Sequence, residues 1–487
     1  MRVKFTIPYI LKTFRGGIAD ESDKGVAGSF KHGYSLDIHS RDDVLKCGST
    51  VTTIDSTVVT DLVQQFVASA DGTVYAFGAT GSIYSISGNA GDPVVNFVYN
   101  DEAGNITGAE EFQASDGVTY MYWATSTAIA RRDMSTGEKA VPWTNAVAVY
   151  KTEKISSSAS WHQMINSQGA LVMGNAEGLS HFSFDSVFDP LKLNIRPGNL
   201  ITALEERDDY TIMGSERSDG SEEGHIWSWI ESVTNWVQKK KIPVKGVNAI
   251  ITTERMLIQG GDEGEIFWSD FVNAIPLHAI PGGGRVTPSG VAIDNDLALF
   301  GFYGGTNPGL WSYGRRMKNR PDALNYQYRL AQTVNGSSVS SIGAVMVFNG
   351  SPIVSWGTTD GSTSDYGIDM VSSTTRANAL YEGLEFDAGA THLKKDIEMV
   401  KVITTPLPSG TSYSIKFKTD KESAWRYAVL AGGSTTYSTT DSVESEWGVG
   451  KPALIYEVGA ELNASGADTP EIQSIVSYIS NEVSEHG

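Results

Sequence analysis

The chain has 487 residues, which exceeds the roughly 250 to 300 residues at which a single hydrophobic core stops growing, so we expect two or more domains. With 57 Asp and Glu against 37 Lys and Arg, the formal net charge of −20 disfavours binding to nucleic acid and to anionic membrane surfaces. The 51 glycines indicate many turns and short strands, which favours an all-β protein.

Residues 1–51 are polar and glycine-rich, with short apolar triplets and no helical period, and we expect an extended N-terminal arm. Lys4, Pro8 and Lys12 interrupt the first apolar stretch, so it does not have the continuous apolar segment of a signal peptide. No segment approaches the roughly 20 apolar residues needed to span a bilayer, so we expect no membrane insertion. Cys47 is the only cysteine, which excludes a disulfide within the chain.

A repeat begins in two stretches that align with each other, FVASADGTVYAFGATGSIYS from Phe66 and FQASDGVTYMYWATSTAIAR from Phe112. Each predicts a strand, a tight Asp-Gly turn, a second strand, another turn and a third strand. Such an antiparallel meander cannot bury both of its faces alone. The sequence therefore predicts that several meanders pack against one another.

Five weaker copies follow, which makes seven. The distances between the anchor residues of successive copies are 45, 53, 40, 46, 41 and 55 residues, which is typical of four-stranded propeller blades. We therefore predict a seven-bladed β-propeller over residues 52–374, with a large β-sandwich and a β-helix as alternative folds. The seven anchor residues are Asp71, Asp116, Gly169, Asp209, Arg255, Asp296 and Ser351.

Two features recur in the copies. Six of them have a glycine at the end of the second predicted strand, where the chain turns sharply or another backbone comes close: Gly78, Gly174, Gly214, Gly260, Gly301 and Gly357. Four have an aliphatic residue followed by an aromatic one, and we expect these pairs to pack between blades: Ile83-Tyr84, Ile226-Trp227, Ile266-Phe267 and Leu310-Trp311.

The pattern changes at about residue 375, and residues 375–487 predict a separate, β-sandwich-like domain. Tyr413, Ile415 and Phe417 share one face of a predicted strand, and Lys416 and Lys418 share the other. This alternation is typical of a sheet with one buried face and one face in water.

Three segments together with the repeat resemble virion proteins of tailed bacteriophages, in particular tail or neck structural proteins that carry a β-propeller. The segments are GSFKHGYSLDIHSRDDVLK, KVITTPLPSGTSYSIKFKTD and PEIQSIVSYIS. The resemblance implies a structural role in the virion tail, as tube decoration, tip or fibre adaptor, with assembly in the host cytoplasm and a role in host attachment. It implies other virion proteins and further copies of the chain as partners, with a host-surface glycan as a further partner, and no enzymatic activity.

Motifs for catalysis or cofactor binding do not stand out. The eight histidines form no HExxH or HxH motif, and no G-x-S-x-G elbow occurs. Two acidic loops, GGDEG from Gly260 and SERSDGSEEG from Ser215, have carboxylates suited to Ca²⁺ but lack the EF-hand spacing, and solvated turns explain them more simply. We therefore predict no catalytic, cofactor-binding or metal-binding residues.

The alternative function is a carbohydrate-binding or sialidase-like, glycan-cleaving propeller. SADGTVYAF and SDGVTYMYW loosely resemble the Ser/Asp/Gly/Thr/aromatic boxes of sialidase blades. The resemblance implies a cluster of arginines at the propeller axis, for which Arg131, Arg207, Arg285 and Arg329 are the candidates. Four tryptophans could stack against sugars, although packing between blades explains most of them: Trp227, Trp229, Trp236 and Trp268.

Overall fold

The protein is almost entirely β-structure. The computed structural model describes residues 6–41, 43–89, 91–100, 104–115, 117–126, 129–133, 155–156, 160–183, 188–360, 363–389 and 394–480. Within them it has a single α-helix, the four-residue α2 (Ala331–Val334). The chain divides into a large unit, Thr52–Leu310 with Leu330–Met370, and a small unit, Met1–Val51 with Trp311–Arg329 and Val371–Gly487.

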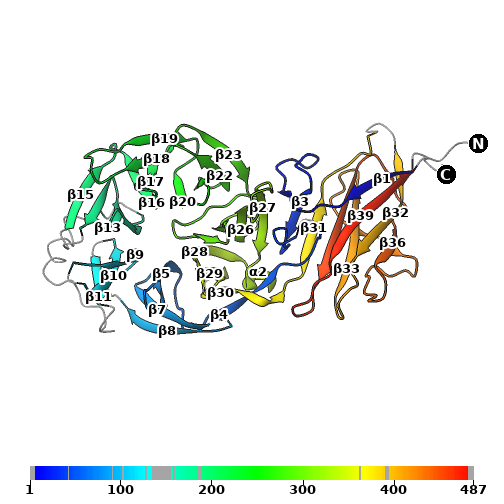
Figure 1. Ribbon diagram of the computed structural model, residues 1–487, viewed down its shortest axis with the longest axis horizontal. Helices are drawn as coiled ribbons and strands as arrows, with labels where there is room; N and C mark the ends of the chain where they lie inside the picture. Colours follow the sequence, from blue (N-terminus) through cyan, green and yellow to red (C-terminus); the bar gives the residue numbers. More distant parts are fainter. Residues whose placement is uncertain are drawn as a thin grey trace, which may run out of the picture. The chain divides into compact units, whose positions relative to one another are not determined.

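Seven small antiparallel sheets follow one another along the chain (Figure 1). The first is β5 (Val63–Ala68), β6 (Val74–Gly78), β7 (Ser82–Asn89) and β8 (Asp92–Asn100), and the second has three described strands, β9 (Ile106–Gln113), β10 (Thr119–Thr125) and β11 (Ile129–Asp133). The third is β12 (Met164–Ser167), β13 (Ala170–Asn175), β14 (Gly178–Phe182) and β15 (Phe188–Asn194), and the fourth is β16 (Asn199–Arg207), β17 (Tyr210–Arg217), β18 (Gly224–Trp229) and β19 (Gln238–Ile242).

The remaining three small sheets continue the same order. The fifth is β20 (Val247–Thr252), β21 (Met256–Gly260), β22 (Glu265–Ser269) and β23 (Ala274–Ala279), and the sixth is β24 (Val291–Asp294), β25 (Leu297–Phe302), β26 (Gly309–Gly314) and β27 (Ala323–Tyr328). The seventh is β28 (Val339–Phe348), β29 (Ser351–Asp360) and β30 (Thr363–Arg376), completed by β4 (Ser49–Asp55) from the start of the chain.

The predicted meanders are confirmed in the described residues. In the first copy β5 pairs with β6 and β6 pairs with β7, both antiparallel, and the predicted Asp-Gly turn lies between β5 and β6. The same antiparallel succession recurs in the third, fourth and fifth sheets. One repeat anchor, Asp116, lies outside the described residues.

The predicted aliphatic–aromatic pairs pack on both faces of their sheets. Because successive side chains of a strand point to opposite faces, the members of a pair enter different cores. Ile83 packs with residues of the second sheet, whereas Tyr84 packs with residues of the seventh. Ile226 packs against the fifth sheet and Trp227 against the third, which confirms that these pairs fill the spaces between sheets.

At three of the six recurring glycines, Gly174, Gly214 and Gly301, the following sheet comes close. A Cβ on Gly214 would lie 2.4 Å from Cγ1 of Val247, and one on Gly301 would lie 2.7 Å from Cγ2 of Ile342. Both neighbours belong to the first strand of the following sheet. The segment that comes close is therefore a side chain and not the backbone that the pattern predicts, and the other three glycines have their nearest atoms elsewhere, in Asp61, Val244 and Ser341.

The small unit contains two sheets of six strands. One has the order β1 (Thr6–Leu11), β39 (Ile472–Ser480), β32 (Lys395–Thr404), β36 (Glu444–Gly448) and β35 (Val429–Leu430), with β37 (Pro452–Ala453) also paired to β32. The other has the order β2 (Gly17–Ile18), β3 (Ser29–Tyr34), β31 (Ala379–Gly383), β38 (Tyr456–Asn463), β33 (Ser412–Thr419) and β34 (Arg426–Tyr427).

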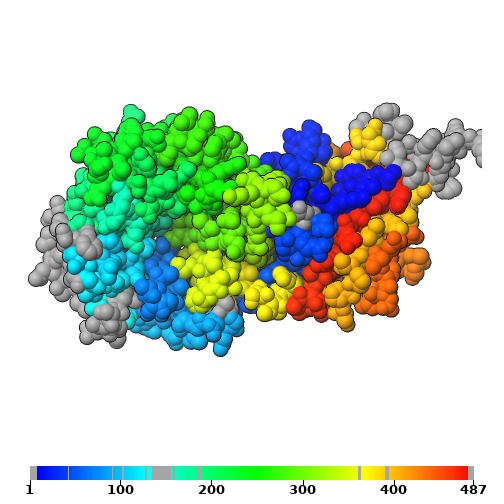
Figure 2. Space-filling model, in the orientation of Figure 1, coloured from blue at the N-terminus to red at the C-terminus, as the bar shows by residue number. Residues whose placement is uncertain are grey.

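The structure corrects the predicted extended arm of residues 1–51. Strand β1 pairs with β39 at the other end of the chain, as Figure 2 shows for the blue and red segments, and β3 pairs with β31. Phe14, Phe30 and Leu36 are fully buried. The short apolar triplets therefore contribute to the core of the small unit, which a polar average composition concealed.

The alternation predicted around Tyr413 is confirmed on one face and corrected on the other. Tyr413, Ile415 and Phe417 are buried in β33, as expected. Lys416, however, is only 5% exposed, and its Nζ pairs with Glu382 at 2.8 Å beside the ring of Trp425. An ion pair and an aromatic ring therefore shield Lys416, whose side chain we predicted to be exposed to water.

Candidate functional site

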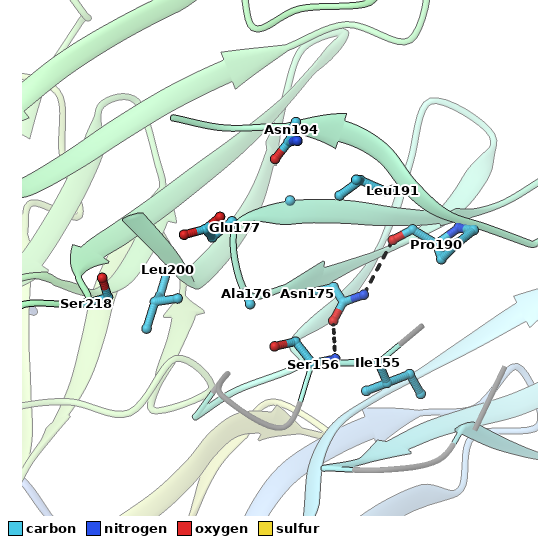
Figure 3. Close-up of a pocket in the computed structure, with 11 residues that line it drawn as sticks. Ile155, Ser156, Asn175, Ala176, Glu177, Pro190, Leu191, Asn194, Leu200 and Ser218 are labelled. Atoms are coloured by element: carbon cyan, nitrogen blue, oxygen red, sulfur yellow. Dashed lines mark hydrogen bonds between the residues drawn. The ribbon is translucent and has the colours of Figure 1, made fainter. Parts of the chain in front are cut away.

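A pocket of about 870 Å³ is lined by residues of the third and fourth sheets (Figure 3). Its walls include Asn175, Glu177, Leu191, Asn194, Leu200 and Ser218. In Figure 3, Leu200 and Ser218 lie on one side of the pocket, and Asn194 and Leu191 lie on another. The two strand pairs β13–β14 and β16–β17 bring these side chains together.

Hydrogen bonds within the chain fix the polar wall of this pocket. The Asn175 side chain accepts from the backbone N–H of Ser156 at 2.8 Å and donates to Oγ of Ser180 at 3.0 Å. Glu177 accepts from the backbone N–H of Gly198 at 2.8 Å. These groups hold the loops that border the pocket, so its shape is set before anything binds.

The third and fourth sheets, which line the pocket, share a hydrophobic core. Leu179 and Leu193 come from the third sheet, and Met213, Trp227 and Trp229 come from the fourth. All five are essentially inaccessible to solvent. This core makes the border between the two sheets a firm base for the side chains at its rim.

Lys239 and His225 lie on the face of the fourth sheet that also carries Trp227. Lys239 lies opposite Trp227 in the ladder, and its Nζ is 4.4 Å from the centroid of that ring. Partial burial and the charge of Arg196 lower the pKa of Lys239. His225 is buried next to Trp227, and burial together with the charge of Lys239 lowers its pKa to about 4, which keeps the imidazole neutral at physiological pH.

Two half-buried carboxylates on first strands were not singled out by the sequence. Burial raises the pKa of Glu110 on β9 to about 8 and that of Glu205 on β16 to about 7. Glu110 accepts from Asn166 of the third sheet at 3.3 Å, and Glu205 accepts from the N–H of Thr252 of the fifth at 3.0 Å. Each stands in a Glu-Glu pair at the end of a strand, and the Glu205 pair follows the apolar run Leu-Ile-Thr-Ala-Leu, which is the sequence signal that could have found it.

The four arginines of the sialidase hypothesis have separate partners. Arg131 lies over the ring of Tyr120 at 3.8 Å, Arg207 pairs with Asp208, and Arg285 pairs with Asp262. Arg329, in the small unit, lies over the ring of Tyr34 at 4.3 Å. These four partners differ from one another, so the contacts do not support a shared axial cluster.

Carboxylates of the two acidic loops form ion pairs with side chains. Asp219 pairs with Arg217 at 3.0 Å, and Glu223 pairs with Lys241 at 2.6 Å. Among the described residues, no group of three or more His, Cys, Asp or Glu side chains is placed to hold a metal ion. Asp219 and Glu223 of the loop from Ser215 are therefore paired with cations of the fourth sheet.

The four tryptophans named as sugar-stacking candidates differ in exposure, and Trp268 on β22 is intermediate. Trp227 and Trp229 are completely buried in the core between the third and fourth sheets, as expected for packing. Trp236 is 40% exposed, and it meets Trp227 edge to face with ring centroids 5.3 Å apart. Trp236 is thus the tryptophan of this set that is exposed at the surface.

In the described part of the chain, the structure has no helix with the length and apolar character needed for a membrane span.

Comparisons with known proteins give likenesses of fold. No family model matches the sequence, and no curated protein does. Solved structures that are similar include the WD40 β-propeller domain of Doa1 (13% identity, 67% of this chain and 97% of that chain, TM-score 0.44). The β-propeller domain of Myceliophteria thermophila Cps50 (Swd1) is similar at 11% identity, over 65% of this chain and 98% of that chain, with a TM-score of 0.43. Streptogramin B lyase is similar at 11% identity, over 66% and 97%, with a TM-score of 0.44.

Proposed function

We propose that this protein is a structural component of the tail of a tailed-bacteriophage virion that acts by assembly with further copies of itself and with other virion proteins. In this proposal the seven small sheets are the blades of a closed seven-bladed β-propeller, and the two six-stranded sheets form a β-sandwich-like domain. Assembly takes place in the host cytoplasm, and no enzymatic turnover is involved.

The order of contacts supports the closed ring. The first strands of successive sheets contact one another in the order β5, β9, β12, β16, β20, β24 and β28, and β28 also contacts β5. Strand β4 completes the seventh sheet from the start of the chain, which ties the first and last sheets together covalently and by hydrogen bonds. Such a disc is stiff because every sheet is packed on both faces.

The observation that carries the assembly role is an apolar patch at β23, the outermost strand of the fifth sheet, which has no Lys, Arg, Asp or Glu, next to β19, which carries three lysines. Val237, Val272 and Ile275 are 44%, 74% and 44% exposed, and they flank or belong to β19 and β23, which contact each other. Edge strands of soluble proteins usually carry charge or are covered, because they otherwise pair with other chains. Exposed aliphatic residues at such an edge favour a protein interface, and we assign it to a second copy of this chain.

The alternative, a carbohydrate-binding or sialidase-like, glycan-cleaving propeller, is favoured by one observation, the exposed indole of Trp236, which packs against the ring of Trp227. Binding at that position is compatible with an assembled structural protein that contacts a host-surface glycan. Cleavage would require a set of catalytic side chains in addition.

The mass of the purified protein in solution tests the assembly role. We expect a defined homo-oligomer by sedimentation or mass photometry. The double variant Val272→Glu with Ile275→Glu should be a monomer, because burying two carboxylates at the interface costs a large desolvation free energy. Val334→Glu, at a position 60% exposed on α2, is the control and should leave the oligomer intact. A wild-type monomer at all accessible concentrations, or an oligomer unaffected by the double change, would contradict the assignment.

A further inference from the structure

The outermost strands of the seven small sheets differ in how they are protected from other chains. Soluble proteins protect an edge strand with charged side chains or with a cover of other segments. Strands β11, β15 and β19 carry charged residues, β4 exposes only a threonine, and all six residues of β27 are buried. Strands β8 and β23 have exposed apolar residues instead, and β23 has no Lys, Arg, Asp or Glu while β8 has none after Asp92.

Strand β8 is an open edge with apolar side chains on both of its faces. It pairs with β7, and no strand pairs with its other edge in the part of the chain that the structure describes. Val94 is 48% exposed and Phe97 is 56% exposed. Their ladder partners, Ser87 and Tyr84, are three residues apart on β7, so Val94 and Phe97 lie on opposite faces of the sheet and flank its edge. A partner at this edge can cover both side chains.

The two apolar edges lie on opposite sides of the large unit (Figure 1), so they cannot cover each other within one chain. A contact between β23 of one copy and β23 of a second copy would leave β8 exposed. A contact between β8 of one copy and β23 of the next covers both edges with a single kind of interface. The free β8 and β23 at the two ends of such a pair can then bind further copies.

Charges beside the two edges are complementary. On β19, the Nζ of Lys240 donates to the carbonyl oxygen of Val272, which holds the ammonium group beside the apolar patch at β23. Asp92 stands exposed at the start of β8. Among the described residues, neither Lys240 nor Asp92 forms an ion pair. A lysine beside one edge and a carboxylate on the other favour contact between unlike edges, whereas two β23 edges would bring lysines together.

We propose that the edge of β8 in one copy of the chain binds the apolar patch at β23 of the next copy, head to tail. Phe97 of one copy packs against Val272 of the next, and Asp92 pairs with Lys240. Pro276 lies within β23 and has no N–H, so the contact is made by side chains rather than by a continuous backbone ladder. This inference rests on the proposed role in assembly and specifies which surfaces carry it.

Mixing two double variants tests the head-to-tail contact, with mass photometry as the readout. Val94→Glu with Phe97→Glu removes the β8 surface, and Val272→Glu with Ile275→Glu removes the β23 surface. Each variant alone should be a monomer. Their equimolar mixture should form a heterodimer and nothing larger, because each variant keeps the one surface that the other lacks. A heterodimer also shows that both variants are folded, since a misfolded chain would not restore the contact.

Other outcomes separate this inference from the assembly role itself. If the β8 variant alone assembles like the wild type, β23 binds its own kind, and the inference fails while the assembly role stands. A mixture that stays monomeric at concentrations at which the wild type assembles would overturn the inference as well. A wild-type monomer would contradict both. Val26→Glu with Val334→Glu, at positions 55% and 60% exposed, adds the same charge elsewhere and should leave the oligomer unchanged.

Charge reversal tests the ion pair between Asp92 and Lys240. Asp92→Lys and Lys240→Glu should each weaken the association about tenfold at low salt, because each places like charges opposite each other. A chain with both changes should recover most of the loss, since the reversed charges attract again across the interface. If the two losses simply add, the two residues do not meet and the assigned contact is wrong.

Discussion

Glu110 makes the stability of the folded chain depend on pH in an unusual direction. Burial raises its pKa from 4.5 to about 8. Between these values the folded protein therefore binds more protons than the unfolded chain, and the contribution of Glu110 to the free energy of unfolding falls as the pH rises. Above about pH 8 the full penalty of a buried carboxylate is present.

We expect Glu110→Gln to remove this penalty, because the amide oxygen can still accept from Asn166 and carries no charge to desolvate. The variant should be more stable than the wild type by about 1 kcal/mol at pH 8.5, after allowance for solvent screening, and nearly equal to it at pH 4.5. Urea unfolding at both pH values measures the difference. Glu222→Gln, an exposed carboxylate, is the control, and an effect of Glu110→Gln that does not change with pH would contradict the explanation.

At the residue scale, the sequence could identify the types of residue in the candidate site but not their neighbours. Trp227 and Trp236 were grouped as equal candidates, yet one is buried and the other is 40% exposed. The charge of Arg196, just before β16, lowers the pKa of Lys239 on β19, although strands β16, β17 and β18 of the same sheet separate them in sequence. Spacing along the chain therefore carried no information about this pair.

At the element scale, the repeated glycine is where the sequence pattern and the packing of sheets agree most closely. We expect Gly214→Ala to destabilise the protein by about 1–3 kcal/mol, because its Cβ would overlap Val247 of the next sheet. Combining it with Val247→Ala should recover part of the loss, since the smaller side chain makes room for the new methyl group. Denaturant unfolding of the three variants measures this coupling, with Gly432→Ala, which has open space around it, as the control.

If Gly214→Ala is neutral, or if the two changes are simply additive, the glycine has a role other than close packing.

The inner strands are predictable from the sequence because they are buried on both faces and form apolar runs, as in β25, whose six residues are all buried. Outermost strands such as β8 are mostly exposed and carry little pattern, so sequence reasoning did not find them.

At the scale of the whole molecule, strands far apart in the sequence pair with each other. Strand β1 pairs with β39, and β4 completes a sheet formed by β28 to β30. Pairings between residues more than 300 positions apart leave no periodic signal in the sequence, which explains why residues 1–51 were predicted as an arm. The all-β class and the repeat, by contrast, follow from local patterns of turns and apolar residues.

Electron microscopy of virus particles from the cells that produce this protein, with an antibody against the chain as label, tests the proposed role most directly. The proposal predicts label at regular, symmetry-related positions on the tail of every particle, because a structural subunit is present in fixed number. Unlabelled particles, together with a free protein that cleaves a sialoside or a bacterial polysaccharide, would contradict the structural role and favour the glycan-cleaving alternative.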